Sequence, residues 1–375
     1  MSSIIKVDTI QLADGTAATI ENLGLATGAL SHRNLIINGD MRVAQRGTQE
    51  TGVTSSGYKT CDRFLFSRAI GTWTIDQSTD APDGFTNSLK MTCTTTETPG
   101  LSSSVGFIYY PEAQDLQHLN YGSSSAKKIT ISFWVKCSET GDFVFEVLQN
   151  DSLRHIGELV TIDTADTWEY KTITFDGDTS GTINNDNGQG LSLKWWTYAA
   201  DYYKTTGSLQ TSWGALDQAA RGYGQTINIV DATSDYFAIT GVQLEVGSVA
   251  TPFEHRSYGE ELARCQRYYQ QLDYDSGDRF VANGFAQNSS ESKFIYQYHG
   301  GEMRAAPTVS EVSVTNGYRY ETGSDNIYRN NIPNKDLASK TQVSFGNNAN
   351  TITGEKPGRM RLAASGARIK FDAEL

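Results

Sequence analysis

The sequence has 375 residues, which exceeds the usual size of one domain and predicts two or three compact units. The formal net charge of −12 and the lack of any Lys/Arg cluster exclude an extended phosphate-binding surface, so no nucleic-acid partner is expected. No apolar run approaches the ~18 residues that cross a bilayer, and the N-terminus lacks the basic and apolar regions of a signal peptide. We therefore expect neither membrane insertion nor signal-dependent secretion.

The composition favours an all-β protein. The 35 glycines suit turns, and the 19 tyrosines and 6 tryptophans suit pleated surfaces. The four cysteines, Cys61, Cys93, Cys137 and Cys265, have no CxxC spacing and no histidine at the spacing of a zinc site. We interpret Cys93 and Cys137, which lie in strand-like runs, as buried apolar residues, with a disulfide as the other interpretation.

Residues 1–30 form a separate N-terminal segment. Its short β-type run contains the apolar residues Ile5, Val7, Ile10 and Leu12. The segment has too few apolar residues to bury a core by itself, so it must pair with something else. Either it docks onto a partner, or it joins the edge of the next domain.

Residues 31–256 form the largest predicted domain. In Ile129–Cys137 apolar residues alternate with others, a period of two that is typical of a strand with one buried face. Similar runs recur with turn signals between them, which predicts a jelly-roll β-sandwich. The predicted strands are Arg63–Ser67, Trp73–Asp76, Ser88–Thr92, Lys128–Cys137, Asp142–Gln149, Tyr170–Phe175, Leu191–Tyr198, Thr226–Ile229 and Tyr236–Val246.

A short connecting helix and a smaller domain follow. Tyr258, Leu262, Cys265 and Tyr269 recur at helical spacing, which predicts a helix over residues 257–272. Two placements fit this helix: around the three-fold axis of a trimer, or against its own sandwich. Residues 273–375 predict a C-terminal β domain, with strands at Phe294–His299, Val309–Val314, Thr341–Phe345, Met360–Leu362 and Arg368–Phe371.

Two matched segments carry a resemblance to a known family. Asn34–Asp40 and Phe237–Gly247 each predict a strand that runs into a turn, and together they predict the opening and closing edges of the sandwich. With Ser132-Phe133-Trp134-Val135, they resemble the carbohydrate-binding-module-like jelly roll of tail fibres and other virion appendages of tailed bacteriophages, including marine or cyanophage types. Residues 1–30 resemble the leader segments of such proteins, and residues 301–307 and 369–375 resemble their C-terminal β domain.

That resemblance implies a homotrimeric structural protein of the virion. It would be assembled in the host cytoplasm and released by lysis, with residues 1–30 docking onto other virion proteins of the tail or the capsid. Modules of the resembled type often carry a structural calcium. Free thiols fit assembly in a reducing compartment.

Catalytic motifs are lacking in the sequence. We find no G-x-S-x-G, no H-E-x-x-H and no phosphate-binding glycine loop, and the five histidines are isolated. A polysaccharide-cleaving enzyme needs two carboxylates across a sugar, but with 43 acidic residues such a pair always exists somewhere. We expect no enzyme activity.

Aromatic residues suggest a carbohydrate-binding site. Sugars are recognised by aromatic faces and by carboxylates and amides that bind hydroxyl groups. The alternative is that these aromatics cover a sheet or fill a subunit interface. The candidate residues are Trp196, Tyr198, Tyr202, Tyr203 and Trp213.

An acidic loop is a candidate calcium site. Asp176, Asp178 and Asp186, near Asn184, Asn185 and Asn187, offer the hard oxygen ligands that Ca²⁺ prefers. Their spacing is not that of an EF-hand, so a solvated turn is the other interpretation.

These observations predict a receptor-binding appendage that adsorbs to a host-surface glycan. Several weak sites on one particle would raise the effective affinity by orders of magnitude. Two other functions fit the sequence: an architectural part of the virion without receptor contact, and a polysaccharide depolymerase.

Overall fold

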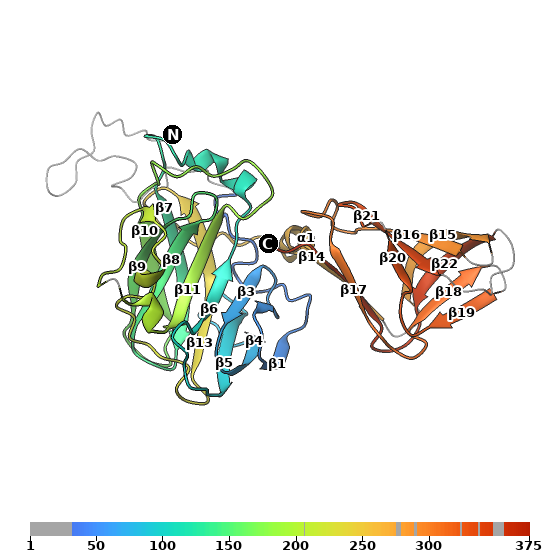
Figure 1. Cartoon of the computed structure of the whole chain (residues 1–375), viewed down its shortest axis with the longest axis horizontal. Coiled ribbons are helices and arrows are strands. Elements are labelled where there is room, and N and C mark those ends of the chain that lie inside the picture. Colours follow the sequence, from blue (N-terminus) through green and yellow to red (C-terminus); the bar gives the residue numbers. More distant parts are fainter. Residues whose placement is uncertain are drawn as a thin grey trace, which may run out of the picture. The chain divides into compact units, whose positions relative to one another are not determined.

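A computed structural model describes residues 32–205, 207–274, 279–288, 291–322, 325–336, 338–347 and 356–375. Within these ranges the chain is all-β and divides into two compact units (Figure 1). Of the described residues, the first unit contains 32–42 and those within Thr48–Arg256, and the second contains Val43–Gly47 and those within Ser257–Leu375. The predicted docking residues Ile5, Val7, Ile10 and Leu12 lie outside the described residues.

The first unit is a jelly-roll sandwich of two antiparallel sheets. One sheet has the order β1 (Gln49–Val53), β4 (Thr72–Ser78), β5 (Ser88–Thr95), β13 (Tyr236–Val246), β7 (Ile129–Cys137) and β10 (Glu169–Phe175). The other has the order β12 (Gly214–Ala215), β9 (Arg154–Ile162), β8 (Gly141–Gln149), β11 (Leu191–Ala199), β6 (Ser104–Tyr109), β3 (Phe64–Arg68) and β2 (Gly57–Tyr58). Three short 3-10 helices lie in its loops: Ala113–Leu119, Asp201–Tyr203 and Gln218–Ala220.

The core of the sandwich lies between the two sheets and is rich in aromatic residues. The alternating apolar residues of β7 are all buried, as their period of two predicts. Across the core, the ring of Trp195 meets those of Phe133 and Phe145 edge to face, with centroids 5.6 and 5.0 Å apart. Cys93 and Cys137 are free and buried, which confirms their interpretation as apolar core residues.

The two matched segments of the family resemblance do meet in space, but not as edges. The backbone N–H of Leu35 donates to the carbonyl of Leu244 (2.9 Å), and the Asn34 side chain accepts from the N–H of Leu244 (3.1 Å). However, residues 34–40 form no strand, and β13 lies inside its sheet between β5 and β7. The prediction of two edge strands was wrong, because residues 34–40 lie as irregular chain beside β13, which is a central strand.

The second unit contains a small sheet and a larger sheet. The small sheet has the order β14 (Tyr269–Asp273), β23 (Arg368–Asp372) and β17 (Thr308–Val312). The larger has the order β19 (Asp325–Arg329), β18 (Tyr318–Thr322), β22 (Lys356–Leu362), β15 (Arg279–Asn288), β16 (Glu291–Gln297), β21 (Gln342–Asn347) and β20 (Asn334–Asp336). Between them lies a second core that contains Phe294, Tyr320, Met360 and Phe371.

The helix α1 spans only Tyr258–Gln266 and is shorter than the predicted 257–272. Ser257 caps it, since its side chain accepts a hydrogen bond from the N–H of Glu260. Tyr269 begins β14 instead of continuing the helix, because its backbone pairs with Asp372. Pairing with a distant strand therefore overrides the local helical spacing.

Val43–Gly47 belongs to the second unit although it lies inside the first unit's sequence. The Gln45 side chain donates to the carbonyl of Tyr269 (2.8 Å), and the Arg46 guanidinium lies over the Tyr269 ring at 3.6 Å. Arg46 also pairs with Asp372 (3.3 Å) and Glu374 (3.4 Å). The second unit is thus assembled from two separate stretches of chain.

Candidate functional site

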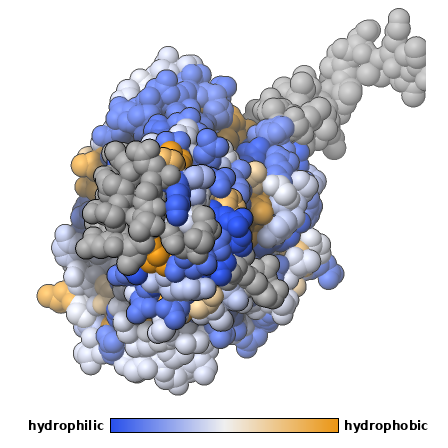
Figure 2. All heavy atoms as spheres, turned by 90° about the vertical axis from the view of Figure 1, so that its right-hand side faces the viewer, coloured by the Kyte–Doolittle hydropathy of each residue, from blue (hydrophilic) through white to orange (hydrophobic). Residues whose placement is uncertain are grey.

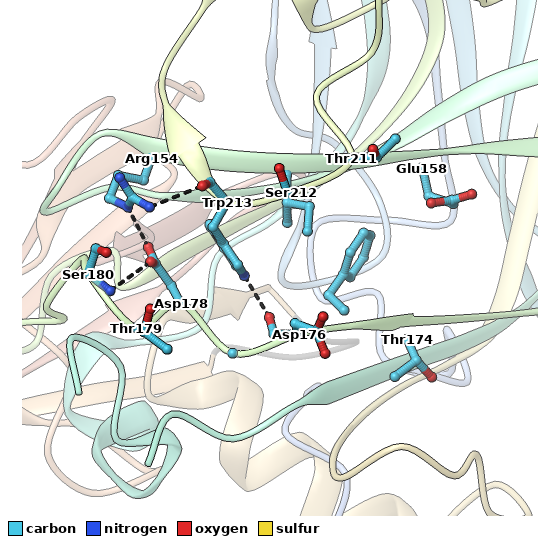
Figure 3. Close-up of a pocket in the computed structure, with 13 residues that line it drawn as sticks. Arg154, Glu158, Thr174, Asp176, Asp178, Thr179, Ser180, Thr211, Ser212 and Trp213 are labelled. Atoms are coloured by element: carbon cyan, nitrogen blue, oxygen red, sulfur yellow. Dashed lines mark hydrogen bonds and ion pairs between the residues drawn. The ribbon is translucent and has the colours of Figure 1, made fainter. Parts of the chain in front are cut away.

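A cleft of about 300 Å³ lies at one edge of the sandwich (Figure 3). Strand β9 of one sheet and the end of β10 of the other line it, together with loop residues 176–180 and 211–213. Two aromatic residues (Phe175 and Trp213), three acidic residues (Glu158, Asp176 and Asp178) and Arg154 line it. Five hydroxyl groups complete the lining, those of Thr174, Thr179, Ser180, Thr211 and Ser212. Such a mixed lining can stack on a ring and bind several hydroxyl groups.

The indole of Trp213 is held in a defined orientation. Its Nε1 donates to the carbonyl of Asp176 (2.6 Å), as Figure 3 shows. The ring also meets that of Tyr121 edge to face, with centroids 5.7 Å apart. The side chain is half-buried, so part of the ring remains available to the cleft.

An ion pair fixes the loops around this ring. Asp178 is 1% exposed, and its Oδ2 lies 2.8 Å from Nε of Arg154. Arg154 also donates to the carbonyl of Trp213 (3.1 Å), and the N–H of Ser180 donates to Asp178 (3.0 Å). Arg154 therefore connects β9 with both loops of the cleft, and its charge neutralises the buried carboxylate.

Gly177 lets the loop approach the neighbouring chain closely. A Cβ atom at this position would lie 2.5 Å from the carbonyl carbon of Ala126 and 2.7 Å from the carbonyl oxygen of Lys127. The next residue is anchored too, since the carbonyl of Asp178 accepts from the N–H of Gly122 (2.8 Å). Only glycine fits there without a shift of the loop.

The structure separates the five predicted sugar-binding aromatics. Trp213 lines the cleft, whereas Trp196 is 1% exposed and offers no face to a ligand. An irregularity in the pairing of β11 with β6 falls between Trp196 and Tyr198, and Tyr198 packs against the sandwich core instead of beside Trp196. Tyr203 covers Trp196, with ring centroids 4.9 Å apart, and Tyr202 is 48% exposed.

Trp196 belongs to a buried polar network on the outer face of β8, β9 and β11. The carboxylate of Glu146 accepts from Trp196 Nε1 (3.0 Å) and from two nitrogens of Arg221 (2.8 and 2.7 Å), and it lies 2.9 Å from Nδ1 of His155. Burial alone would raise the pKa of Glu146, but the charge of Arg221 and the hydrogen bonds from His155 and Arg221 hold it at about 2. This network fastens the loop that carries Arg221 to the sheet.

The three predicted calcium ligands do not form one cluster. Asp178 pairs with Arg154, and the exposed Asp176 pairs with Lys128 (3.0 Å). Asp186 accepts from the N–H of Gly188 (2.8 Å), which is a local turn. Asp176 and Asp178 line the cleft, while Asp186 is not among its lining residues.

Within the described ranges, a different acidic trio does have ligand atoms within 4.8 Å of one another: Glu139, Asp231 and Asp235. Burial raises the pKa of Glu139, and the charges of Asp235 and Asp231 raise it further, while the N–H of Asn228 opposes the shift. Carboxylate oxygens of this kind suit Ca²⁺ better than a soft metal. Sequence analysis missed this trio because Glu139 lies far from the two aspartates along the chain.

Glu158 and Arg154 are cleft residues that sequence analysis also missed. Both lie on β9, which was not predicted as a strand. The exposed Glu158 and Leu159 are consecutive residues and interrupt the alternation that reveals other strands. One signal was available: the turn residues Asn150-Asp151 follow β8 directly, and such a turn predicts a hairpin partner strand after it.

No family model matches the chain, and no curated protein matches it. None of the described helices is long and apolar enough to cross a membrane.

Several solved structures resemble parts of the chain. The enzymatically active domain of tailspike protein 4 from bacteriophage CBA120 has 11% identity and a TM-score of 0.30; the match covers 61% of this chain but 23% of that one. A family 11 carbohydrate-binding module of a cellulosomal cellulase from Clostridium thermocellum has 15% identity and a TM-score of 0.25, with 59% and 97% covered. The module TmCBM61, in complex with β-1,4-galactotriose, has 10% identity and a TM-score of 0.27, with 57% and 99% covered. The chain thus spans about a quarter of the length of the tailspike structure.

Proposed function

We propose that this chain is a tail fibre or related appendage of a tailed-bacteriophage virion, and that it binds a host-surface glycan through the cleft beside Trp213. The observation that carries the proposal is the combination of an oriented, half-buried indole with acidic and hydroxyl groups in one cleft. An indole covers the C–H face of a sugar ring, and the surrounding carboxylate of Glu158 and hydroxyl of Thr174 suit its hydroxyl groups.

The proposal includes the assembly that the sequence resemblance implies. The protein would be a homotrimer in the virion, docked through residues 1–30 and released by lysis, without enzyme activity. Several clefts on one particle would act together, so that weak single sites give tight adsorption. A structural calcium remains part of this proposal, with the Glu139 trio as the described group whose geometry suits it better than Asp176, Asp178 and Asp186.

Binding of the purified chain to a glycan array and to host cells tests the proposal. We expect Trp213→Ala to weaken glycan binding at least about fivefold, because a stacked ring contributes roughly 1–3 kcal/mol. Tyr202→Ala is the matched control, since it removes an exposed aromatic that is not among the residues lining the cleft. Equal binding by both variants would refute the assignment of the cleft.

Two experiments distinguish the other functions. An architectural role predicts that the purified chain neither binds host cells nor competes with virion adsorption, and that labelled antibody marks the capsid or the tail shaft. A depolymerase predicts release of reducing ends from host polysaccharide. We expect competition with adsorption, label at the tail and no reducing ends.

A further inference from the structure

The larger sheet of the second unit has one face buried in the core and one face exposed. Residues directly opposite each other in antiparallel strands project from the same face. Tyr328 pairs with Arg319, Arg319 with Arg361 and Arg361 with Phe280, which makes one row across β19, β18, β22 and β15.

A second row lies beside the first. Glu321 pairs with Arg359, Arg359 with Asn283 and Asn283 with Ile295. The intervening residues Tyr320 and Met360 are buried, so both rows lie on the face away from the core. We call these two rows, with the neighbouring pair Phe285–Lys293, the outer face of this sheet.

Large apolar side chains are exposed on this outer face. Phe280, Phe285, Ile295 and Tyr328 are 46, 45, 48 and 43% exposed. The surface that Figure 2 shows is mostly hydrophilic, with hydrophobic residues in small groups. Four such residues on one sheet face are more than the scattered single residues of an ordinary surface, and they indicate a contact surface.

The same face carries positive charge. The single carboxylate of Glu321 accepts from Arg361 (3.1 Å), pairs with Arg319 (2.6 Å) and is also bound by Arg359. Three guanidinium groups therefore lie around one carboxylate on this part of the face. The Arg359 side chain remains 53% exposed, so it can reach a ligand.

The second unit differs from the first in net charge. Residues 257–375 contain fourteen Lys/Arg and fourteen Asp/Glu residues, so the net charge of −12 lies entirely in residues 1–256. An anionic ligand is therefore not repelled by the net charge of the second unit, while the first unit disfavours it.

We propose that the outer face of this sheet binds an anionic polysaccharide, one that carries carboxylate, sulfate or phosphate groups. Planar guanidinium groups pair with such anions through two parallel hydrogen bonds, and the exposed phenyl and phenol rings cover the C–H faces of sugar rings. The binding does not depend on the order of sugars along the polymer, and its affinity falls as the salt concentration rises. It does not depend on the cleft beside Trp213.

Two other occupants fit less well. The acidic first unit of a second copy would form a head-to-tail contact, which generates open-ended filaments instead of a closed oligomer. Nucleic acid needs many clustered cations along its backbone, whereas this face groups three arginines around one carboxylate on a strongly acidic protein.

Binding of the full-length chain to sodium polygalacturonate and to dextran sulfate, with neutral dextran as the uncharged probe, tests the proposal. Affinity electrophoresis gives the dissociation constants. We expect both anionic polymers to retard the chain and dextran to leave it unretarded. Arg359→Gln with Arg361→Gln removes two of the three guanidinium groups and is expected to weaken binding about tenfold, and Phe285→Ala should weaken it severalfold.

A matched double variant, Lys340→Gln with Lys370→Gln, removes two positive charges outside the outer face. Lys340 is as exposed as Arg359, with 50% of its side chain accessible, and Lys370 lies on the small sheet. This control should bind as the unaltered chain does. Failure of both anionic polymers to bind, equal losses in the two double variants, tighter binding to single-stranded DNA, or polymer-independent self-association through this face would overturn the proposal.

Discussion

The ammonium group of Lys194 lies over the ring of Trp196, with Nζ 3.3 Å from the ring centroid. Lys194 is 6% exposed, and burial together with the nearby charge of Arg221 lowers its pKa to about 7, although Glu146 opposes the shift. The contact with the indole compensates for part of the lost hydration.

Lys194→Met should stabilise the fold. Between about pH 7 and the ordinary lysine pKa near 10.4, the unfolded chain holds a proton that the folded chain lacks, so stability rises with pH across this window. The variant removes that slope and should gain about 1 kcal/mol or more at pH 7. Urea unfolding at pH 7 and pH 9.5 measures both effects. A variant that is less stable at pH 7 would show that the ammonium contributes net stability.

Glu146→Gln should destabilise the first unit by about 3–5 kcal/mol, because it leaves Arg221 without its ionic partner in a buried site. The folded pKa of Glu146 lies below its unfolded value, so the carboxylate stabilises the fold above about pH 4.5. In the unaltered chain this contribution is lost as the pH falls from about 4.5 to 2. Thermal melts across that range should show a steep loss for the unaltered chain and a flatter dependence for the variant.

Gly177→Ala should destabilise the chain by about 1–3 kcal/mol, because the new methyl group meets backbone atoms of Ala126 and Lys127. Gly259→Ala is the matched control. Gly259 lies in α1, nothing within 4 Å would meet its Cβ, and alanine is the better helix former, so this variant should gain about 0.5–1 kcal/mol. The melting temperatures of the two variants test this prediction. An unchanged melting temperature for Gly177→Ala would mean that the loop can move away from Ala126 and Lys127.

Asp231→Asn should raise the melting temperature in buffer with EDTA. The change removes one of three neighbouring carboxylates, so repulsion falls and the pKa of Glu139 moves back toward its usual value. The gain should be a few tenths of a kcal/mol, as for an exposed like-charge pair. Added Ca²⁺ provides the second arm: a rise in melting temperature that the variant loses would assign a bound cation to this trio. A lower melting temperature in EDTA would contradict the repulsion.

Regular alternation made much of the first unit predictable. Strands such as Ile129–Cys137 and Tyr236–Val246 were found within a residue or two, because one face of each packs on the core. Thr226–Ile229 was predicted as a strand but forms none; its N–H groups at Thr226 and Ile227 instead bind the carbonyl of Asp142. Short apolar runs do not reveal which partner satisfies their backbone.

The candidate site was only partly predictable. Trp213, Asp176 and Asp178 were selected by residue type, and the structure brings them to one cleft. Trp196 was selected for the same reason, but a network centred on Glu146, fifty residues away, buries it. Burial by a distant loop does not change the residue pattern around a tryptophan. The sequence alone therefore does not distinguish Trp213, which lines the cleft, from the buried Trp196.

The place of Val43–Gly47 in the second unit affects the order in which the chain can fold during synthesis. The partner of Gln45, Tyr269, lies 224 residues later in the chain, and Glu374, a partner of Arg46, lies 328 residues later. At about 5–20 residues per second, the ribosome leaves these side chains without their contacts for roughly ten seconds to a minute. The first unit can complete the sandwich within that delay, while Val43–Gly47 still lacks its partners in the second unit. Asp372 and Glu374 must be synthesised before Arg46 can form its ion pairs, so a segment near residue 45 reaches its native contacts only when the second unit folds.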